Sequence, residues 1–155
     1  MLTPTDILSR YWPEAHLPID PIKIAERAGV KVLPLPLDEW EVSGKYEEVG
    51  YRGMPTIYFN PEEGDYRRRF TIAHELGHYF LNHGPRYRDT RETFNDGYNY
   101  IEVSANKFAA DILMPRIYLE ILINKKGITS PVELSRIFAV SETAMNYRLQ
   151  NLGFY

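Results

Sequence analysis

The spacing of hydrophobic and polar positions changes character near residue 66. Before it, short runs rich in β-branched and aromatic residues are broken by glycine and proline, which predicts two or three short strands, with "TIYF" at 56–59 the clearest. The run "VKVLPLPL" at 30–37 is also β-prone, and its prolines favour a sheet edge. After residue 66 the apolar positions follow a helical period. The pattern predicts an α+β fold in which a small antiparallel sheet packs on helices.

Two central segments have the strongest helical pattern. Residues 66–83 are predicted to form one helix, and "IEVSANKFAADILMP" at 101–115 a second that ends at its proline. Between them, residues 84–100 carry glycine, proline and charged residues without a period, so we interpret them as an exposed loop. The inward positions of the second helix are Ala105, Phe108, Ala109, Ile112 and Leu113.

Capping signals mark the shorter helices at both ends of the chain. A Thr-Pro pair at 3–4 and an Asp-Pro pair at 20–21 predict two N-terminal helix starts, and Gly29 predicts the end of the second. Ser130 and Ser141 predict two C-terminal helices joined by a tight turn. That C-terminal pair has the outline of a helix-turn-helix.

Composition narrows the chemistry that the chain can perform. Its 155 residues are 44% hydrophobic and 25% charged, as in ordinary globular proteins. A net charge of −3 provides no electrostatic footprint for non-specific nucleic-acid binding. Without cysteine, only His, Asp and Glu remain as metal ligands. We find no secretory signal and no apolar run of about 18 residues, so we expect a cytoplasmic protein without membrane contact.

The candidate chemistry is concentrated in "HELGH" at 74–78. Residues four apart on a helix lie one above the other, so His74 and His78 would direct their imidazoles at one metal ion. Glu75 lies about 100° round the helix from His74, where it could act as a general base on the attacking water. The alternative is a buried pair of histidines satisfied by other protein groups. A glycine at position 77 makes the helix less stable by about 1 kcal/mol relative to alanine. We therefore expect another reason for it, namely that a neighbouring element approaches the helix closely at this point.

A catalytic zinc site needs a third protein ligand. Glu102 is the best candidate because it begins the second central helix on the same face as the apolar stripe, although the helix dipole alone also favours Glu there. Asn106, one turn on, could orient Glu102. His83 lies about 140° from the metal-facing line, so we interpret it as a histidine near the helix C-terminus. Asp96 and Asp111 are weaker alternatives.

With these residues identified, the chain resembles the ImmA/IrrE family of metallopeptidases. The segments "RRRFTIAHELGHYFL" and "EVSANKFAADILMP" match that family in order and rough separation, and "PIDPIKIAERAGV" and "LSRIFAVSETAMNYRLQNLG" agree more loosely. The resemblance implies a zincin-like core with one Zn²⁺ on His74, His78 and Glu102, and Glu75 as the general base. Mn²⁺ or Fe²⁺ would also suit a His₂-carboxylate site.

The resemblance also implies a substrate and an organisation. Members of the family cleave a transcriptional repressor of the helix-turn-helix type, which relieves repression, and are often encoded on prophages or in stress-response loci. We therefore expect a zinc-dependent endopeptidase with one metallopeptidase-like domain over 1–155. Its expected parts are the N-terminal helices and sheet in 1–65, the metal-site helices in 66–115 and the C-terminal helices in 116–155.

Peptide hydrolysis also needs a hydrogen-bond donor for the oxyanion. Tyr98 and Tyr100, just before the third ligand, are candidates, as is Tyr87. Most of the 12 tyrosines must have packing or surface roles instead.

Two alternative functions remain open at this point. One is a metal-containing regulatory binding protein, such as a toxin or antitoxin partner of a repressor, that performs no proteolysis. A carboxylate ligand disfavours it, since closed structural zinc sites usually have four His or Cys ligands. The other is a DNA-associated protein that reads DNA with its C-terminal helices. Arg148 is the only basic side chain in the second of these, so direct nucleic-acid binding is not expected.

Overall fold

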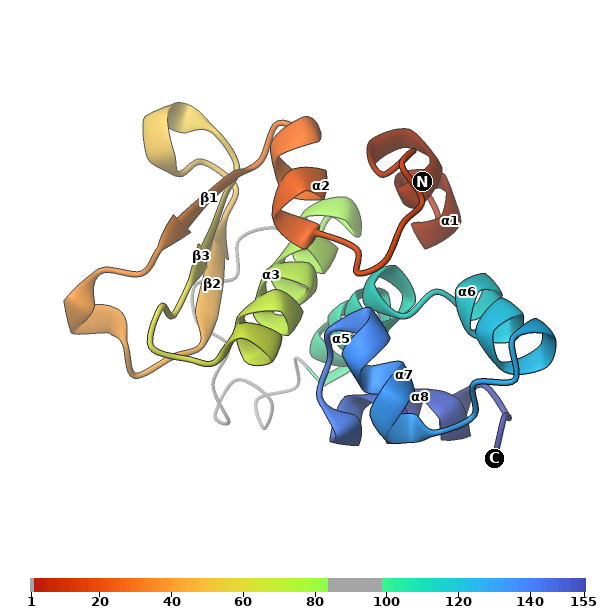
Figure 1. The fold of residues 1–155 in the computed structure, drawn as a ribbon. Coiled ribbons are helices and arrows are strands. Elements are labelled where there is room, and N and C mark those ends of the chain that lie inside the picture. The colour runs from red at the N-terminus through yellow and green to blue at the C-terminus, as the bar shows by residue number, and fades with distance from the viewer. Residues whose placement is uncertain (1, 84–98) are drawn as a thin grey trace.

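Two helices, α3 (Asp65–Phe80) and α5 (Asn99–Leu113), pack against each other in the middle of the fold. The computed structural model describes residues 2–83 and 99–155. A three-stranded sheet with α2 lies on one side of this helix pair, and the C-terminal helices lie on the other (Figure 1). The expected loop therefore falls mostly outside the described residues, and its last two positions, 99 and 100, belong to α5.

The sheet is mixed rather than antiparallel. Its strands are β1 (Lys31–Pro34), β2 (Gly44–Glu47) and β3 (Thr56–Phe59), in the order β1-β3-β2. β2 pairs antiparallel with β3, but β1 pairs parallel with it, so the predicted antiparallel sheet was wrong in this respect. A parallel pair needs a crossover of a dozen or more residues, and the chain between β1 and β3, which contains β2 itself, supplies it. The predicted edge position of the proline-rich strand is confirmed.

The N-terminal helices begin and end where their capping residues predict. The Thr3 side chain accepts a hydrogen bond from the backbone of Asp6 and completes a capping box at the start of α1 (Pro4–Tyr11). Asp20 caps α2 (Pro21–Arg27), which ends just before Gly29. Both helices contribute to a first apolar cluster with the sheet, α3 and α5. Its fully buried members are Ile7, Trp12, Ile19, Ile24, Ala25, Val30, Tyr46, Ile57, Ile72, Leu76, Phe108 and Ile112.

The C-terminal helices form a second apolar cluster. They are α6 (Arg116–Glu120), a π-helical turn (Ile121–Lys125), α7 (Pro131–Phe138) and α8 (Glu142–Asn151). The predicted caps of α7 and α8 are confirmed, since Ser130 accepts from the backbone of Glu133 and Ser141 from that of Ala144. α3 and α5 contribute to this cluster as well, so they are packed between two apolar cores. The second cluster consists of Ala73, Ala109, Leu113, Met114, Leu119, Leu134, Phe138, Val140, Met145 and Leu149.

The close packing of α3 on α5 depends on Gly77. A Cβ atom at this position would lie 3.2 Å from Cβ of Phe108 and 3.3 Å from Cα of Ala105. The expected reason for a glycine inside the helix, close approach of a neighbouring element, is confirmed. The helix axes can therefore come near enough for side chains of α3 and α5 to share one site.

Arg69 ties α3 to more distant parts of the chain. Its guanidinium donates to the backbone carbonyl oxygens of Ile19, before α2, and of Phe138 and Ala139, at the turn between α7 and α8. Burial lowers the pKa of Arg69, and the three carbonyl contacts stabilise its charge.

Among the described residues, no helix is both long enough and apolar enough to cross a membrane.

Candidate metal centre

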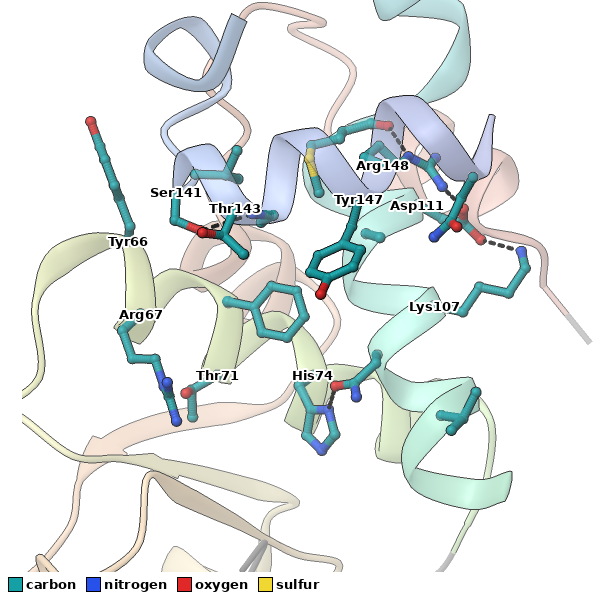
Figure 2. A pocket seen from close by; sticks show the side chains of 18 of the residues that line it. Tyr66, Arg67, Thr71, His74, Lys107, Asp111, Ser141, Thr143, Tyr147 and Arg148 are labelled. Atoms are coloured by element: carbon teal, nitrogen blue, oxygen red, sulfur yellow. Dashed lines mark hydrogen bonds and ion pairs between the residues drawn. The ribbon is translucent and has the colours of Figure 1, made fainter. Parts of the chain in front are cut away.

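A cavity of about 1000 Å³ opens between α3, α5 and α8, and His74 lines it (Figure 2). Glu75, the next residue on α3, also faces this cavity, and Ser43, just before β2, lies at its margin. Residues from α3 and α5 form one side, and residues from the turn before α8 and from α8 itself form the other. Helix α3 thus places two adjacent polar side chains of "HELGH" at an opening that a large ligand can enter.

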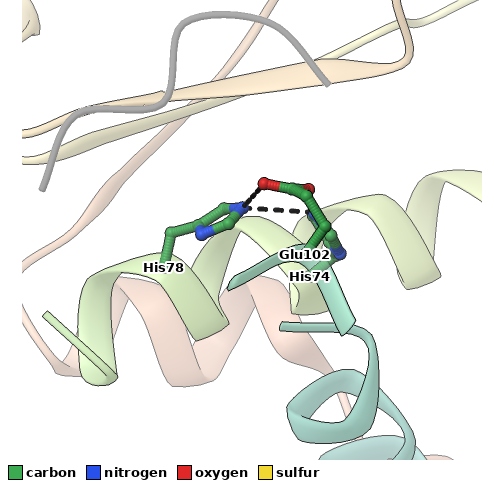
Figure 3. Close-up of side chains that lie close together, drawn as sticks. All are labelled: His74, His78 and Glu102. Atoms are coloured by element: carbon green, nitrogen blue, oxygen red, sulfur yellow. Dashed lines mark hydrogen bonds and ion pairs between the residues drawn. The ribbon is translucent and has the colours of Figure 1, made fainter. Parts of the chain in front are cut away.

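Three buried side chains converge beside this cavity (Figure 3). Nε2 of His74 lies 2.9 Å from Oε2 of Glu102, and Nε2 of His78 lies 3.3 Å from Oε1 of the same carboxylate. The two Nε2 atoms are 3.2 Å apart. The structure therefore brings together the two histidines of one helix and the glutamate predicted as third ligand from the first turn of another.

These separations fit a divalent metal ion. Ligand atoms at about 2.0–2.1 Å from a tetrahedral zinc lie about 3.3 Å from one another. The three observed separations are 2.9, 3.2 and 3.3 Å. Three protein ligands leave a fourth position for water or substrate, as in catalytic rather than closed structural sites. Two imidazoles and a carboxylate also suit Mn²⁺ and Fe²⁺, so the donor set defines a metal site without selecting one metal.

Asn106 contacts a histidine rather than the carboxylate that we expected it to orient. Its Oδ1 lies 2.8 Å from Nδ1 of His74. An amide oxygen only accepts hydrogen bonds, so Nδ1 of His74 donates and its Nε2 presents a lone pair to the cluster. This contact gives His74 the tautomer that a metal ligand requires.

His83 orients the other histidine through a short chain of hydrogen bonds. Oγ of Ser104 donates to the carbonyl of Ile101 at 2.8 Å and accepts from Nε2 of His83 at 3.3 Å. Nδ1 of His83 is then the acceptor in its 3.0 Å contact with Nδ1 of His78. Consequently Nε2 of His78 also presents a lone pair to the cluster.

Sequence reasoning missed this role because it treated His83 as part of a continuous helix. The helix ends at Phe80, and Asn82 adopts a left-handed conformation with φ of 60°. The backbone N–H of Asn82 donates to Tyr79 and that of His83 to His78, which is the Schellman pattern. That motif places the residue after the left-handed position against the last turn. Asn82, a residue that tolerates this conformation, was the available signal.

Glu75 is buried on the side of α3 that faces β2. A Cβ atom on Gly44, the first residue of β2, would lie 3.6 Å from Oε2 of Glu75, but only 2.6 Å from Cγ2 of Thr71 and 2.7 Å from the carbonyl oxygen of Tyr58. A side chain at position 44 would therefore push β2 away from α3. Gly44 lets the strand cover the carboxylate while the cavity side stays open.

Two other predicted site residues, Tyr100 and Asp111, do not join the cluster. Tyr100 is exposed in the first turn of α5. Tyr87, Asp96 and Tyr98 lie outside the described residues. Asp111 instead forms ion pairs with Lys107 at 3.0 Å and Arg148 at 2.9 Å.

Arg148 points into the protein rather than away from it. Its Nη1 contacts Oδ1 of Asp111, and its Nε donates to the carbonyl oxygen of Met114 at 2.9 Å. Burial lowers the pKa of Arg148, whereas the charge of Asp111 raises it. The one basic side chain of α8 thus anchors that helix to α5.

The comparisons with known proteins agree with this site. The family model Peptidase_M78, described as the IrrE N-terminal-like domain, matches residues 25–150. The match runs from within α2 to the last turn of α8 and includes His74, His78 and Glu102. No curated protein matches the chain.

Proposed function

The chain belongs to the Peptidase_M78 family, the IrrE N-terminal-like domain, and from this premise we propose that it is a zinc-dependent endopeptidase. The observation that carries the proposal is the convergence of His74, His78 and Glu102 next to Glu75, at the margin of a large cavity. Two ligands and a base from one helical turn, with a carboxylate from a second helix, form the donor set of a hydrolytic metal site.

Each residue has a defined part in this reaction. A Zn²⁺ ion held by the three ligands would supply Lewis-acid chemistry that acidifies a water and polarises the scissile carbonyl. Glu75 removes a proton from the attacking water and then delivers it to the leaving amine. Asn106 and His83 keep the two imidazoles oriented through their Nδ1 hydrogen bonds. β2 covers Glu75 on one side, so substrate approaches from the cavity.

We further propose that the substrate is a transcriptional repressor of the helix-turn-helix type and that cleavage relieves repression. The resemblance of "RRRFTIAHELGHYFL" and "EVSANKFAADILMP" to the ImmA/IrrE family supports this substrate. A cytoplasmic location follows from a substrate of that kind. Direct DNA reading by α8 is disfavoured, because Arg148 is engaged with α5 and few phosphate contacts remain available to that helix.

The proposal is tested by incubating the zinc-loaded protein with helix-turn-helix repressors from the same organism, with and without a chelator. Fragments that form only without the chelator are expected. Glu75→Gln should keep one zinc per chain and lose at least about 100-fold in cleavage rate. Glu62→Gln, the same change at an exposed position before α3, is the matched control and should cleave normally.

Two results would contradict the proposal. Cleavage by Glu75→Gln at the normal rate would remove Glu75 from the mechanism. A stable, uncut complex between the zinc-loaded protein and the repressor would favour the regulatory binding protein instead.

A further inference from the structure

The cavity that reaches His74 and Glu75 extends well beyond the metal centre, along α3 and α5 to α8. We call this extension the α8 groove. Its volume with the site, about 1000 Å³, is at the upper end of the roughly 300–1,000 Å³ that is usual for ligand pockets. The apolar residues that line the groove include Phe70, Ala110, Met114, Val140, Ala144 and Leu152.

Large hydrophobic side chains at the groove remain exposed. Tyr66 on α3 is 44% exposed, Val103 on α5 is 57% exposed and Tyr147 on α8 is 63% exposed. Figure 2 shows the Tyr147 side chain projecting from α8 into the space above α3 and α5, with His74 on the opposite side. Exposed apolar side chains gathered from three helices around one cavity mark a binding surface rather than a packing core.

The wall formed by α8 is fixed relative to the metal-site helices. Arg148 binds Asp111 and the carbonyl of Met114 on α5, and Arg69 on α3 donates to the carbonyls of the turn that precedes α8. Met145 and Leu149 on the inner face of α8 are fully buried. A wall held this firmly can discriminate between side chains by size, because it does not yield to a poor fit.

We propose that the α8 groove binds the substrate peptide next to its scissile bond and selects a large apolar side chain there, with α8 as the specificity-determining wall. The inference rests on the proposed peptidase function. The occupant is the substrate because the groove is continuous with His74 and Glu75, so a peptide lying at the metal centre must extend along it. Thr143 and Tyr147, which line the groove and are exposed, determine how large a side chain fits.

The first experiment measures cleavage specificity. The zinc-loaded protein is incubated with peptides from a tryptic digest of a whole proteome, and the cut bonds are identified by mass spectrometry. Leu, Ile, Met, Phe or Tyr should be enriched at one position beside the bond. Thr143→Trp should fill the groove, lower kcat/KM for such peptides by about tenfold or more, and shift the preference to small residues. Asn146→Trp, an exposed position of the same helix outside the groove, should change nothing.

The second experiment needs no catalysis. Fluorescence anisotropy measures binding of a labelled Ala-Ala-Phe-Leu-Ala-Ala peptide to zinc-loaded Glu75→Gln, against the same peptide with two serines in place of Phe-Leu. The apolar peptide should bind about tenfold or more tightly, in line with the burial of two large apolar side chains. Adding Thr143→Trp should abolish the difference, and adding Asn146→Trp should retain it.

The two experiments separate the failure of each proposal. Cleavage without any side-chain preference, or an unchanged profile in Thr143→Trp, overturns the groove assignment and leaves the peptidase standing. No cleavage of the repressor or of the peptides, together with selective, Thr143-dependent binding, overturns the peptidase and leaves the groove as a peptide-binding site without a scissile bond. Equal binding of the two peptides to Glu75→Gln overturns the groove assignment whatever the cleavage result.

Discussion

The metal centre and the anchor of α8 lie at opposite ends of α5, and both place charged groups in the protein interior. At the anchor, Arg148 meets the carboxylate of Asp111, so the positive and negative charges both come from the chain. At the metal centre, the Glu102 carboxylate meets two Nε2 atoms whose lone pairs face it. Negative and electron-rich groups converge there, and a divalent cation would satisfy all three. The two regions should therefore respond differently to metal.

Loss of a metal ligand should have the largest effect. The wild type should carry one zinc per chain, and zinc at 1,000 times its Kd should stabilise the fold by about 4 kcal/mol. His78→Ala should abolish both the stoichiometric zinc in elemental analysis and the rise in Tm when zinc is added. His16→Ala, at an exposed histidine outside the cluster, is the matched control. If His78→Ala still binds one zinc per chain, His78 is not a metal ligand.

Arg148→Ala should have the next largest effect, on the free energy of unfolding and not on zinc binding. Removing one partner of a buried ion pair is strongly destabilising. Because Asp111 keeps its exposed partner Lys107 and retains 21% side-chain exposure, we expect a loss of about 3 kcal/mol, at the low end of such losses. Urea unfolding measures it, and zinc per chain should stay at one. Lys107→Ala removes the other partner of Asp111, but Lys107 is 74% exposed, so it should cost about 0.5 kcal/mol or less. Loss of zinc in Arg148→Ala would show that the two regions are not independent.

The features that the sequence predicted well depend on local geometry. Thr3, Asp20, Ser130 and Ser141 cap helices within three residues of themselves, so the sequence contains the whole interaction. The pairing of His74 with His78 is equally local, because four residues make about one helical turn. Predicting Glu102 as a ligand required one further inference, that its helix turns one face towards the protein interior. The stripe of apolar residues identified that face.

The features that could not be predicted from the sequence depend on contacts between distant parts of the chain. The parallel pairing of β1 with β3 is determined by how residues 35–55 cross the sheet, which no local pattern encodes. Arg148 finds its carboxylate partner 37 positions earlier, and Asn106 contacts a helix that lies 32 residues away. The contact of His83 with His78 depends on one left-handed residue, Asn82. A helix continued past Phe80 would have directed this imidazole elsewhere.

His83→Ala tests that contact, with a smaller expected effect on the metal centre. Removing an outer partner of a metal-ligating histidine lowers metal affinity by about 10–100-fold. Zinc should still bind stoichiometrically at saturating concentration, and competition with a chelating indicator should show the weaker Kd. Asn106→Ala removes the hydrogen-bond partner of His74 and should weaken zinc binding to a similar extent. If the Kd for zinc is unchanged in His83→Ala, the contact between His83 and His78 contributes to packing only.

The smallest effect is expected at an ion pair outside both regions, between Glu14 and Arg27. It has bidentate geometry, with distances of 2.8 and 2.7 Å, but its side chains remain 32% and 38% exposed. Hydrogen bonds from Arg27 are the largest cause that lowers the pKa of Glu14 from 4.5 to about 2. Because the folded pKa is depressed, this stabilisation is complete above pH 4.5 and is lost as pH falls towards about 2. The stability difference between wild type and Glu14→Gln should therefore be constant near neutral pH and shrink below pH 4.5. Solvent screening should make this difference smaller than that for Arg148→Ala, and 1 M NaCl should reduce it further. An effect as large as that of Arg148→Ala would mean that burial is not what distinguishes the anchor of α8 from a surface ion pair.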